Sequence, residues 1–328
     1  MTVVLSTITI GDGPDVGTLA ARRLRDGGLV AFPTETVYGL GADAINAKAI
    51  ARLYAAKGRP AFNPLIAHLC NLEAARQIAD FNAQALRLAE VFWPGPLTLV
   101  LPRAAGCPVA DLATAGLDTI AVRVPAHPIA RKILRAFGGP VVAPSANLSG
   151  HVSPTTAAHV QNDLGGRIDL IIDGGAVEVG VESTIVGCFD VPTLLRPGGV
   201  PRGEIERVLA RPLLRPPDDV DSDPKQPLAP GMLASHYAPR TKIRLNAGTV
   251  EAGEALLAFG AEAIPGIDAA SGVMNLSVRG DLNEAAANLF GYLRVLDASG
   301  ARAIAVMPVP HHGLGEAIND RLGRAAVP

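Results

Sequence analysis

The chain has 328 residues, of which 48% are hydrophobic, so it is long and apolar enough to bury a sizeable core. Its 29 basic and 31 acidic side chains give a net charge of −2, which does not point to a polyanionic partner but leaves room for a local basic cleft. The three cysteines are widely spaced, and the chain shows neither a signal-peptide pattern nor an apolar run of about 18 residues. We therefore expect a cytoplasmic protein without disulfides or a CxxC zinc site.

A stretch rich in proline and aspartate divides the chain. Six prolines and four aspartates lie between Arg211 and Tyr237, and proline fixes φ and lacks a backbone donor, so this stretch is not the interior of a helix or strand. Its end, residues 230–239, is apolar and aromatic where a plain spacer would stay polar. The predicted first domain, linker and second domain are residues 1–211, 212–238 and 239–328.

Apolar runs and capping residues predict the elements of the first domain. In chain order, strands are expected at 28–32, 65–69, 97–101, 119–124, 141–143, 170–173, 183–189 and 193–195. Helices are expected from Asn46 to Gly58, from Asn71 onward, and at 127–137 and 155–164. Strands outnumber helices and some follow each other directly. This pattern predicts a mixed, partly antiparallel sheet with flanking helices.

The second domain alternates more regularly. Strands are expected at 242–245, 273–276 and 303–307, and helices at 250–259 and 282–298. Such alternation is typical of a small, three-layered, Rossmann-like α/β unit.

The first candidate for a site follows the strand at 28–32. Thr34, Glu35 and Thr36 come where that strand ends, which is where open α/β sheets place ligands, although a threonine-stabilised turn would have the same composition. Gly39 and Gly41 approximate a dinucleotide loop, but no acidic ribose partner follows at the required distance. We interpret them as residues of a tight turn.

The second candidate is the segment from Lys57 to Pro64, at a helix exit. Cations at a helix C-terminus are ordinarily explained by the helix dipole. Here two prolines stiffen a loop that contains Lys57, Arg59 and Asn63, which suits a phosphate-bearing ligand. His68 follows on the next strand, where a hydrogen-bonded core histidine is the alternative to a functional one.

The third candidate lies on a strand. Period-two alternation puts Thr119, Ala121 and Arg123 on one face, and a buried guanidinium must be paired. A substrate carboxylate or an internal salt bridge would serve equally. Only five of the 29 basic residues are lysine, which favours guanidinium groups wherever phosphate or carboxylate is bound.

The fourth candidate is the small, polar segment from Ala143 to Gly150, with Ser153 beyond it. Ser145 and Asn147 stand among small residues whose backbone N–H groups can approach phosphate oxygens closely, although a plain polar loop reads the same way. Ser145 lacks the GxSxG elbow, so covalent acyl chemistry has little support.

Taken together, these segments resemble the YrdC-like family. The Lys57-Gly58-Arg59 and Ser145-Ala146-Asn147 signatures carry the resemblance, and the linker motifs Pro230-Gly231-Met232 and His236-Tyr237 extend it to the two-domain threonylcarbamoyl-AMP synthases. The resemblance implies a twisted YrdC-like sheet and a nucleotidyltransferase that makes threonylcarbamoyl-AMP and pyrophosphate from L-threonine, bicarbonate or CO₂, and ATP. This is the first step towards N6-threonylcarbamoyladenosine at position 37 of tRNAs that read ANN codons.

The resemblance also implies roles for individual residues. Threonine would be bound by Thr36, His68, Arg123, Ala143 and Ser183. ATP would be bound by Lys57, Arg59, Asn63, Thr119, Ser145, Asn147, Ser153, Arg196 and Tyr237, with Tyr237 and the linker closing as a lid. Lys57, Arg59 and His68 are the catalytic candidates. Mg²⁺ would be held through the phosphates without a protein metal site. The product would pass to the tRNA threonylcarbamoyl transferase machinery, so tRNA would be served only indirectly and no membrane would be involved.

Two other functions fit parts of the pattern. In an RNA-binding module without catalysis, Lys57, Arg59, Arg123 and Arg196 would line a surface for a phosphate backbone, but no basic run with interleaved aromatics accompanies them. YrdC-like domains also perform carbamoyl transfer in hydrogenase maturation, in chains with CxxC zinc fingers that are not visible here.

Overall fold

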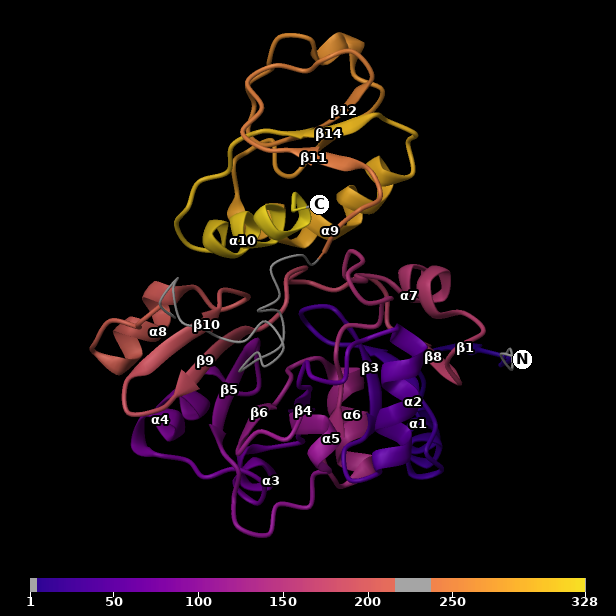
Figure 1. Ribbon diagram of the computed structural model, residues 1–328, viewed down its shortest axis with the longest axis vertical. Coiled ribbons are helices and arrows are strands. Elements are labelled where there is room, and N and C mark those ends of the chain that lie inside the picture. Colours follow the sequence, from indigo (N-terminus) through magenta and orange to yellow (C-terminus); the bar gives the residue numbers. More distant parts are fainter. Residues whose placement is uncertain (1–4, 216–236, 328) are drawn as a thin grey trace.

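The strands of the first unit form one mixed sheet (Figure 1). The computed structural model describes residues 5–215 and 237–327, and ten strands of the first of these ranges belong to this sheet. In sheet order they are β1 (Ile8–Gly11), β8 (Leu170–Asp173), β2 (Val30–Pro33), β3 (Tyr38–Asp43), β7 (Val141–Val142), β4 (Ile66–His68), β6 (Thr119–Arg123), β5 (Leu97–Pro102), β9 (Thr184–Cys188) and β10 (Pro192–Arg196). It contains both parallel and antiparallel pairs, which confirms the predicted mixed sheet.

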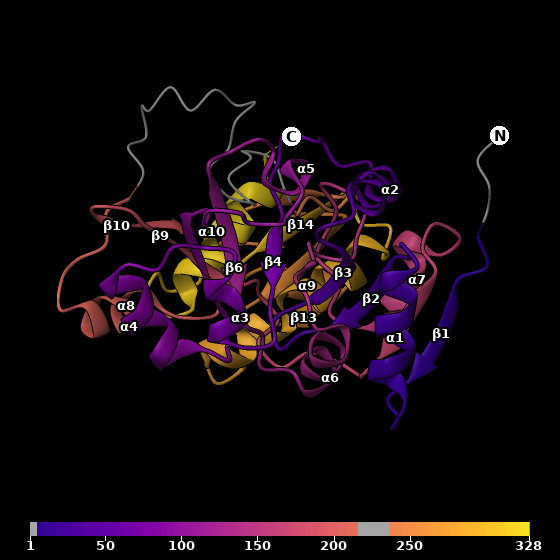
Figure 2. The ribbon, with the colours of Figure 1, turned by 90° about the horizontal axis from the view of Figure 1, so that it is seen from below.

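Helices pack on both faces of this sheet (Figure 2). On one face, α1 (Val16–Arg25) packs against α6 (Pro128–Phe137), and their apolar side chains meet Val30 and Phe32 of β2. The opposite face carries α2 (Ala47–Lys57), α3 (Leu72–Arg76), α4 (Ala83–Phe92), α5 (Asp111–Thr114), α7 (Ala157–Leu164) and α8 (Arg202–Leu209). The face of α1 and α6 continues over β4, β6, β5 and β9, where it forms the floor of the candidate site.

Local signals in the sequence set several helix ends correctly. Asn46 caps α2 by accepting hydrogen bonds from the backbone N–H groups of Lys48 and Ala49. Gly58 ends that helix in the left-handed conformation, with φ of 60°. Asn71 caps α3 in the same way that Asn46 caps α2. These ends follow from hydrogen bonds between neighbours in sequence, which is why the sequence alone predicts them.

The tight turn expected at Gly39 and Gly41 is wrong, because both residues lie in β3 between β2 and β7. A Cβ atom on Gly41 would lie 2.7 Å from a ring carbon of Phe32, so the missing side chain allows close packing within the sheet. The sequence pattern also does not predict β1, α1, α4, α5, α8 and α10 (Gly315–Ala325). Four of these helices, α1, α5, α8 and α10, begin without a side-chain cap, so the usual start signal is absent.

The second unit contains a smaller, parallel sheet. Within residues 237–327 its strands are, in sheet order, β11 (Lys242–Arg244), β14 (Ala303–Val306), β12 (Glu254–Ala258) and β13 (Val273–Asn275). Helices α9 (Leu282–Asp297) and α10 pack on one face. A segment containing the 3₁₀ turn η1 (Ile267–Ala269) packs on the other. The predicted small α/β unit is confirmed.

The helix expected at 250–259 is wrong, since this segment contains strand β12. Ala255 and Leu257 pack towards α9 and α10, whereas Leu256 and Ala258 pack into the cluster on the opposite face. Burial on both faces outweighs the helix propensity of these alanines and leucines.

The predicted domain limits at 211 and 238 fall between α8 and β11, and stay predictions. Most of the predicted linker, residues 216–236, lies outside the described residues.

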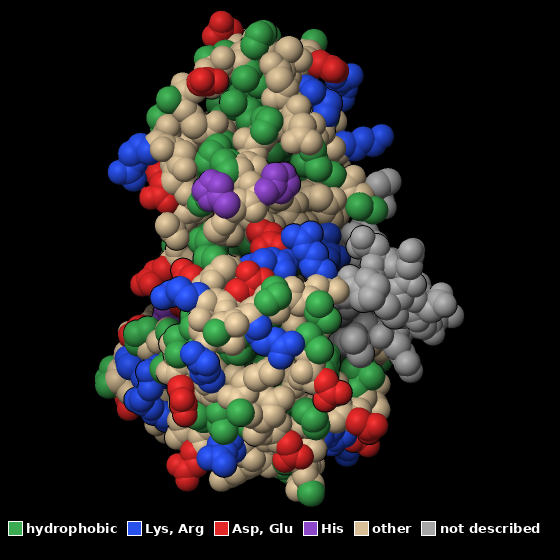
Figure 3. Space-filling view, turned by 90° about the vertical axis from the view of Figure 1, so that its left-hand side faces the viewer, with side chains coloured by type: hydrophobic (Ala, Val, Ile, Leu, Met, Phe, Trp, Pro, Cys, Tyr) green, Lys and Arg blue, Asp and Glu red, His purple; other side chains and the backbone are tan. Residues whose placement is uncertain are grey.

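The two units are in direct contact (Figure 3), and α9 and α10 of the second unit face the first unit (Figure 1). Val37, Val152 and Val181 of the first unit belong to the same apolar cluster as these helices. Ion pairs surround this cluster, among them Arg294 with Asp163 at 2.8 Å. The second unit therefore packs through both apolar and charged contacts.

Gly180 of the first unit packs against the backbone of α9 in the second. Its φ is +76°, and an added Cβ atom would lie 2.3 Å from the carbonyl oxygen of Ala286 in α9. Gly175 has a similar φ of +81°, but an added Cβ would meet nothing within 4 Å. An alanine at position 175 would therefore cause backbone strain alone, whereas an alanine at position 180 would cause the same strain and a steric clash with the second unit.

We expect Gly175→Ala to destabilise the protein by about 1 kcal/mol through backbone strain, and Gly180→Ala to add about 1–3 kcal/mol of overpacking. Thermal unfolding of the two variants checks this, since each kcal/mol lowers the midpoint by about 2–4 °C in a domain of this size. Equal midpoints for the two variants would show that α9 does not pack tightly on Gly180.

Candidate active site

One cavity collects nine of the residues that the sequence analysis selected. It lies between the large sheet and the second unit and has a volume of about 560 Å³ when the solvent space at its open mouth is included. The selected residues that line it are Thr36, Arg59, His68, Arg123, Ala143, Ser145, Ser183, Arg196 and Tyr237. These residues are far apart in sequence, but the sheet brings them together because most of them lie at or just beyond the ends of its strands.

The register of the sheet explains why His68 and Arg123 meet. Strands β4 and β6 are parallel neighbours in which His68 pairs with Arg123 and Ile66 with Ala121. Side chains of paired residues point to the same face. His68 and Arg123 therefore stand side by side at the ends of their strands, above an apolar floor that includes Ile66 and Ala121.

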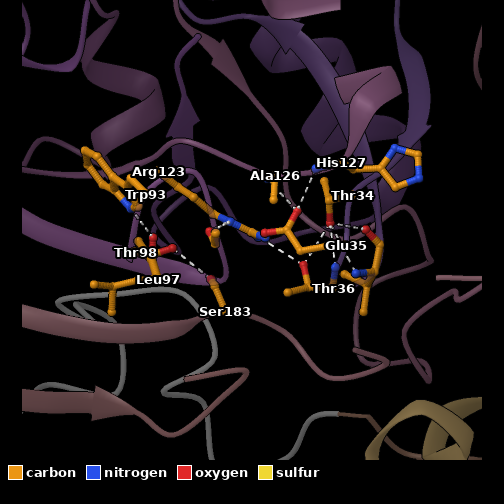
Figure 4. Close-up of polar contacts among 12 residues, drawn as sticks. Thr34, Glu35, Thr36, Trp93, Leu97, Thr98, Arg123, Ala126, His127 and Ser183 are labelled. Atoms are coloured by element: carbon orange, nitrogen blue, oxygen red, sulfur yellow. Dashed lines mark hydrogen bonds and ion pairs between the residues drawn. The ribbon is translucent and has the colours of Figure 1, made fainter. Parts of the chain in front are cut away.

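Arg123 forms a buried ion pair with Glu35 (Figure 4). Its Nη2 lies 2.5 Å from Glu35 Oε1, its Nη1 donates to Thr36 Oγ1 at 3.0 Å, and its Nε donates to the carbonyl of Gly95 at 3.2 Å. The sequence is compatible with an internal salt bridge or a ligand carboxylate at Arg123, and the internal salt bridge is present. These bonds use three of the five N–H groups of the guanidinium, so each terminal nitrogen keeps one further N–H.

Glu35 is fixed by more than Arg123. Its Oε2 accepts hydrogen bonds from the backbone N–H groups of Ala126 at 2.9 Å and His127 at 3.3 Å (Figure 4). Burial alone would raise the pKa of Glu35, but the Arg123 guanidinium and the hydrogen bond from Ala126 hold it below its ordinary value. The carboxylate is therefore ionised and compensates the buried guanidinium.

Two further guanidinium groups line the cavity. Arg196 is buried and donates to the carbonyl of Ser183 through Nη2 at 2.9 Å and through Nε at 3.2 Å. Arg59 donates to the carbonyl of Pro64 at 2.9 Å and to that of Asn63 at 3.3 Å. Burial lowers the pKa of Arg59 to about 10, so the group stays protonated at neutral pH. The cavity therefore offers three fixed cations to an anionic ligand.

Hydroxyl groups stand beside these cations. Ser183 Oγ lies 2.8 Å from Thr98 Oγ1, and Thr36 Oγ1 lies 2.8 Å from Thr34 Oγ1, in both cases in buried surroundings (Figure 4). Paired hydroxyls are oriented before any ligand arrives, since each one constrains the rotation of the other.

His68 is a neutral hydrogen-bonding group in this cavity. Its Nδ1 lies 3.1 Å from the carbonyl oxygen of Ile66, a geometry that places the ring proton on Nδ1 and leaves Nε2 as an acceptor. Burial, aided by the charge of Arg123, lowers the pKa of His68 to about 3. An imidazole with so low a pKa accepts hydrogen bonds well but is a weak proton acceptor.

Lys57 does not line the cavity. Its side chain is buried, and its Nζ donates to the backbone carbonyls of Ser145 at 2.6 Å and Asn147 at 2.5 Å. The backbone carbonyl of Lys57 in turn accepts from the N–H of Ser149. The amino group therefore holds the segment from Ser145 to Ser149 against the end of α2, and reaches the cavity only through that segment.

The remaining selected residues lie around the cavity rather than in its lining. Asn63 is buried, and its Oδ1 has no hydrogen-bond partner among the described residues. Asn147 donates to the carbonyl of His151, and Ser153 donates to Glu182. Thr119 begins β6, on the same face as Arg123 but four residues away, or about 13 Å at the rise of a strand.

Six further residues line the cavity: Thr34, Val37, Gly39 and Pro144 lie within candidate segments but had no ligand assigned to them, whereas Ile66 and Glu182 lie outside those segments. Of these, Glu182 changes the chemistry most, because it brings a buried carboxylate to a cationic cavity. Its position directly before Ser183, at the entry to β9, was the available signal.

The described residues contain no group of three or more His, Cys, Asp or Glu side chains that could hold a metal ion. In the same residues, no helix combines the length and the apolar character needed to cross a bilayer.

The low pKa of His68 makes the protein less stable in acid. Its ordinary value is about 6.5, so between pH 6.5 and 3 the unfolded chain binds a proton that the folded chain does not. Acidification from pH 6.5 to 5 should therefore cost about 2 kcal/mol at this one residue.

We expect the free energy of unfolding to fall less between pH 6.5 and 5 in His68→Gln than in the parent, with a difference of about 2 kcal/mol. Urea unfolding at the two pH values measures it. Other histidines titrate equally in both proteins and cancel in the difference. Identical pH dependence in the two proteins would contradict a buried, neutral His68.

Comparisons with known proteins agree with this geometry. Residues 22–198 match the Sua5/YciO/YrdC family model, described as telomere recombination, and residues 200–327 match the model of the threonylcarbamoyl-AMP synthase C-terminal domain. The chain is 44% identical to a threonylcarbamoyl-AMP synthase of Pyrococcus abyssi, over 94% of this chain and 93% of that one. It is 41% identical to that of Bacillus subtilis, over 94% and 92% of the two chains.

The solved structures show the same similarity. A crystal structure of P. abyssi Sua5 in complex with L-threonine superimposes with a TM-score of 0.87 and 39% identity, covering 98% of this chain and 97% of that one. Both units of the fold are therefore shared, and the predicted family resemblance is confirmed. The chain belongs to the threonylcarbamoyl-AMP synthases, as a member that carries both the YrdC-like and the C-terminal domain.

Proposed function

We propose that the cavity binds L-threonine and ATP side by side and forms threonylcarbamoyl-AMP there. The threonine amine attacks bicarbonate, with loss of water, or CO₂, with loss of a proton, to give a carbamate. A carbamate oxygen then attacks the α-phosphate of ATP, and pyrophosphate leaves with the electron pair of the broken P–O bond. The observation that carries this proposal is the meeting of three guanidinium groups, paired hydroxyls and a neutral imidazole in one cavity.

Threonine fits the part of the cavity around Arg123. The two unused N–H groups of its guanidinium suit a carboxylate, and Glu35 keeps that guanidinium in place. Thr36 and Ser183 offer hydroxyls, and His68 Nε2 offers an acceptor for the amine or hydroxyl of the substrate. Ala143 would contribute its backbone. Neither step needs a protein nucleophile, so positioning suffices.

ATP fits the part around Arg59 and Arg196. Their charges offset repulsion at the phosphates, and the small residues around Ser145 allow close approach of the backbone. Asn63 and Thr119 would contact the nucleotide farther along the face. We assign Lys57 and Asn147 to holding the Ser145 segment.

Magnesium is proposed to enter with ATP. The described residues offer no acidic cluster, so phosphate oxygens and water would hold the ion. It would offset phosphate charge, together with Arg59 and Arg196.

Tyr237 is proposed to act at the boundary of the nucleotide site. It lines the cavity and is fully buried, and it lies directly after the part of the linker that is not described. A lid at this point would limit loss of a labile adenylate to water. The cytoplasmic product would then pass to the machinery that transfers the threonylcarbamoyl group to tRNA, so this chain would serve tRNA only indirectly.

The proposal is tested by product formation. Purified protein given ATP, Mg²⁺, bicarbonate and L-threonine should yield threonylcarbamoyl-AMP in mass spectrometry, and omission of bicarbonate or threonine should abolish it. If the protein retains tRNA in a filter-binding assay but forms no adenylate, an RNA-binding module is the better explanation.

We expect Arg59→Ala to lower threonine-dependent pyrophosphate release by about 100-fold or more, because it removes a fixed charge from the phosphate site. Arg52→Ala is the matched control, since Arg52 lies on the neighbouring helix α2 but forms a half-exposed ion pair with Asp169 away from the cavity. An Arg59→Ala protein as active as Arg52→Ala would overturn the assignment of Arg59 to ATP.

A further inference from the structure

Glu182 places a negative charge in a cavity that is proposed to bind anionic substrates. The carboxylate lines the cavity and is only 6% exposed. Its Oε1 accepts a hydrogen bond from Ser153 Oγ at 2.5 Å. A hydroxyl offsets little of a full negative charge at a site that must also accept a triphosphate. Glu182 therefore needs a cation of its own.

That cation comes from the other unit. Arg321 lies on α10, and its Nε donates to Glu182 Oε2 at 2.8 Å. The Arg321 side chain is fully buried, although the two residues are 139 positions apart in sequence. Burial alone would raise the pKa of Glu182, but Arg321, with Arg196 and the bond from Ser153, holds it below its ordinary value.

Arg321 also contacts the aromatic residue of the cavity. Its guanidinium carbon lies 5.1 Å from the centre of the Tyr237 ring, within the range of a cation–π interaction. Tyr237 in turn stacks on Phe290 of α9, with ring centres 5.6 Å apart and an interplanar angle of 24°. Two residues of the second unit therefore fix the orientation of Tyr237.

One terminal nitrogen of the Arg321 guanidinium has no hydrogen-bond partner among the described residues. Nη1 of Arg321 pairs with Asp320 at 2.5 Å, whereas Nη2 is buried and has no hydrogen-bond partner among the described residues. A buried donor without an acceptor destabilises a structure, so Arg321 is not placed for stability alone.

The other ion pairs between the units differ from this one. Arg202 pairs with Glu316 at 2.6 Å, and both side chains are about one-fifth exposed. Neither residue lines the cavity. The Arg202 pair joins the same two units, and even the same helix α10, without touching the site. It therefore gives the matched control for a purely structural link.

We propose that Arg321 is a positioning residue of the active site, supplied by the C-terminal domain, which neutralises Glu182 and holds Tyr237 so that the cavity accepts ATP. This inference rests on the proposed function for the identity of the anion. It assigns the C-terminal domain a direct effect on nucleotide affinity, through one side chain.

The test measures ATP and threonine binding by calorimetry in the full chain, together with the unfolding midpoint. Arg321→Met should weaken ATP binding at least tenfold, because Glu182 is left as an uncompensated charge beside the phosphates. Arg202→Met should leave ATP binding within twofold of the parent. The double variant Arg321→Met with Glu182→Gln should bind ATP at least fivefold more tightly than Arg321→Met, because the Glu182 carboxylate no longer repels the phosphates.

A merely structural role gives a different pattern. It predicts that Arg321→Met weakens ATP and threonine binding alike, in step with a lower unfolding midpoint, and that Glu182→Gln brings no recovery. Either that pattern or unchanged ATP binding in Arg321→Met overturns the proposal. If Arg321→Met does not fold, Arg321→Lys carries the test: ATP binding within threefold of the parent supports the charge, and a tenfold loss contradicts it.

The two proposals fail in distinguishable ways. A parent protein that binds ATP but forms no threonylcarbamoyl-AMP contradicts the proposed reaction and leaves the Arg321 comparison intact, because that comparison uses binding alone. A parent protein that forms the product while Arg321→Met binds ATP normally contradicts only the role of Arg321.

Discussion

The buried ion pair between Arg123 and Glu35 is the contact on which the cavity depends. Neither charge could be buried alone, so each fixes the other, and each then orders a different part of the chain. Arg123 reaches the backbone at Gly95, and Glu35 reaches the backbone at Ala126 and His127. Three connecting segments are therefore held around one guanidinium. The pair orders the site and still leaves donors for a substrate carboxylate.

Such a site works by positioning. Its guanidinium groups are bonded to backbone carbonyls or to Glu35, and its hydroxyls are paired with each other, so little rearrangement is needed when substrates bind. His68 fits the same scheme, because burial keeps it neutral and turns it into a fixed acceptor. A reaction between an amine, bicarbonate and ATP supplies its own nucleophile and leaving group. The protein then has to align them and offset their charge.

The sequence predicts what depends on neighbours in the chain. The ends of α2 follow from Asn46 and Gly58, and the alternation along β6 correctly puts Ala121 and Arg123 on one face. It fails where burial on two sides decides the outcome, as in β12, whose alanines and leucines favour a helix until two layers cover them. The site follows the same division. Strand-end residues were found from their motifs, whereas the pairing of Glu182 with Arg321 joins two domains and has no local signal.

The C-terminal domain closes the cavity on the side where the large sheet has no helix of its own in the described residues. Apolar contacts of Val37, Val152 and Val181 with α9 and α10 give this closure its area, and such contacts are non-directional. They would tolerate small shifts of one unit on the other. The contact of Arg321 with Glu182 and Tyr237 is directional, so it converts a loose packing of two domains into a defined position for the residues that face the nucleotide.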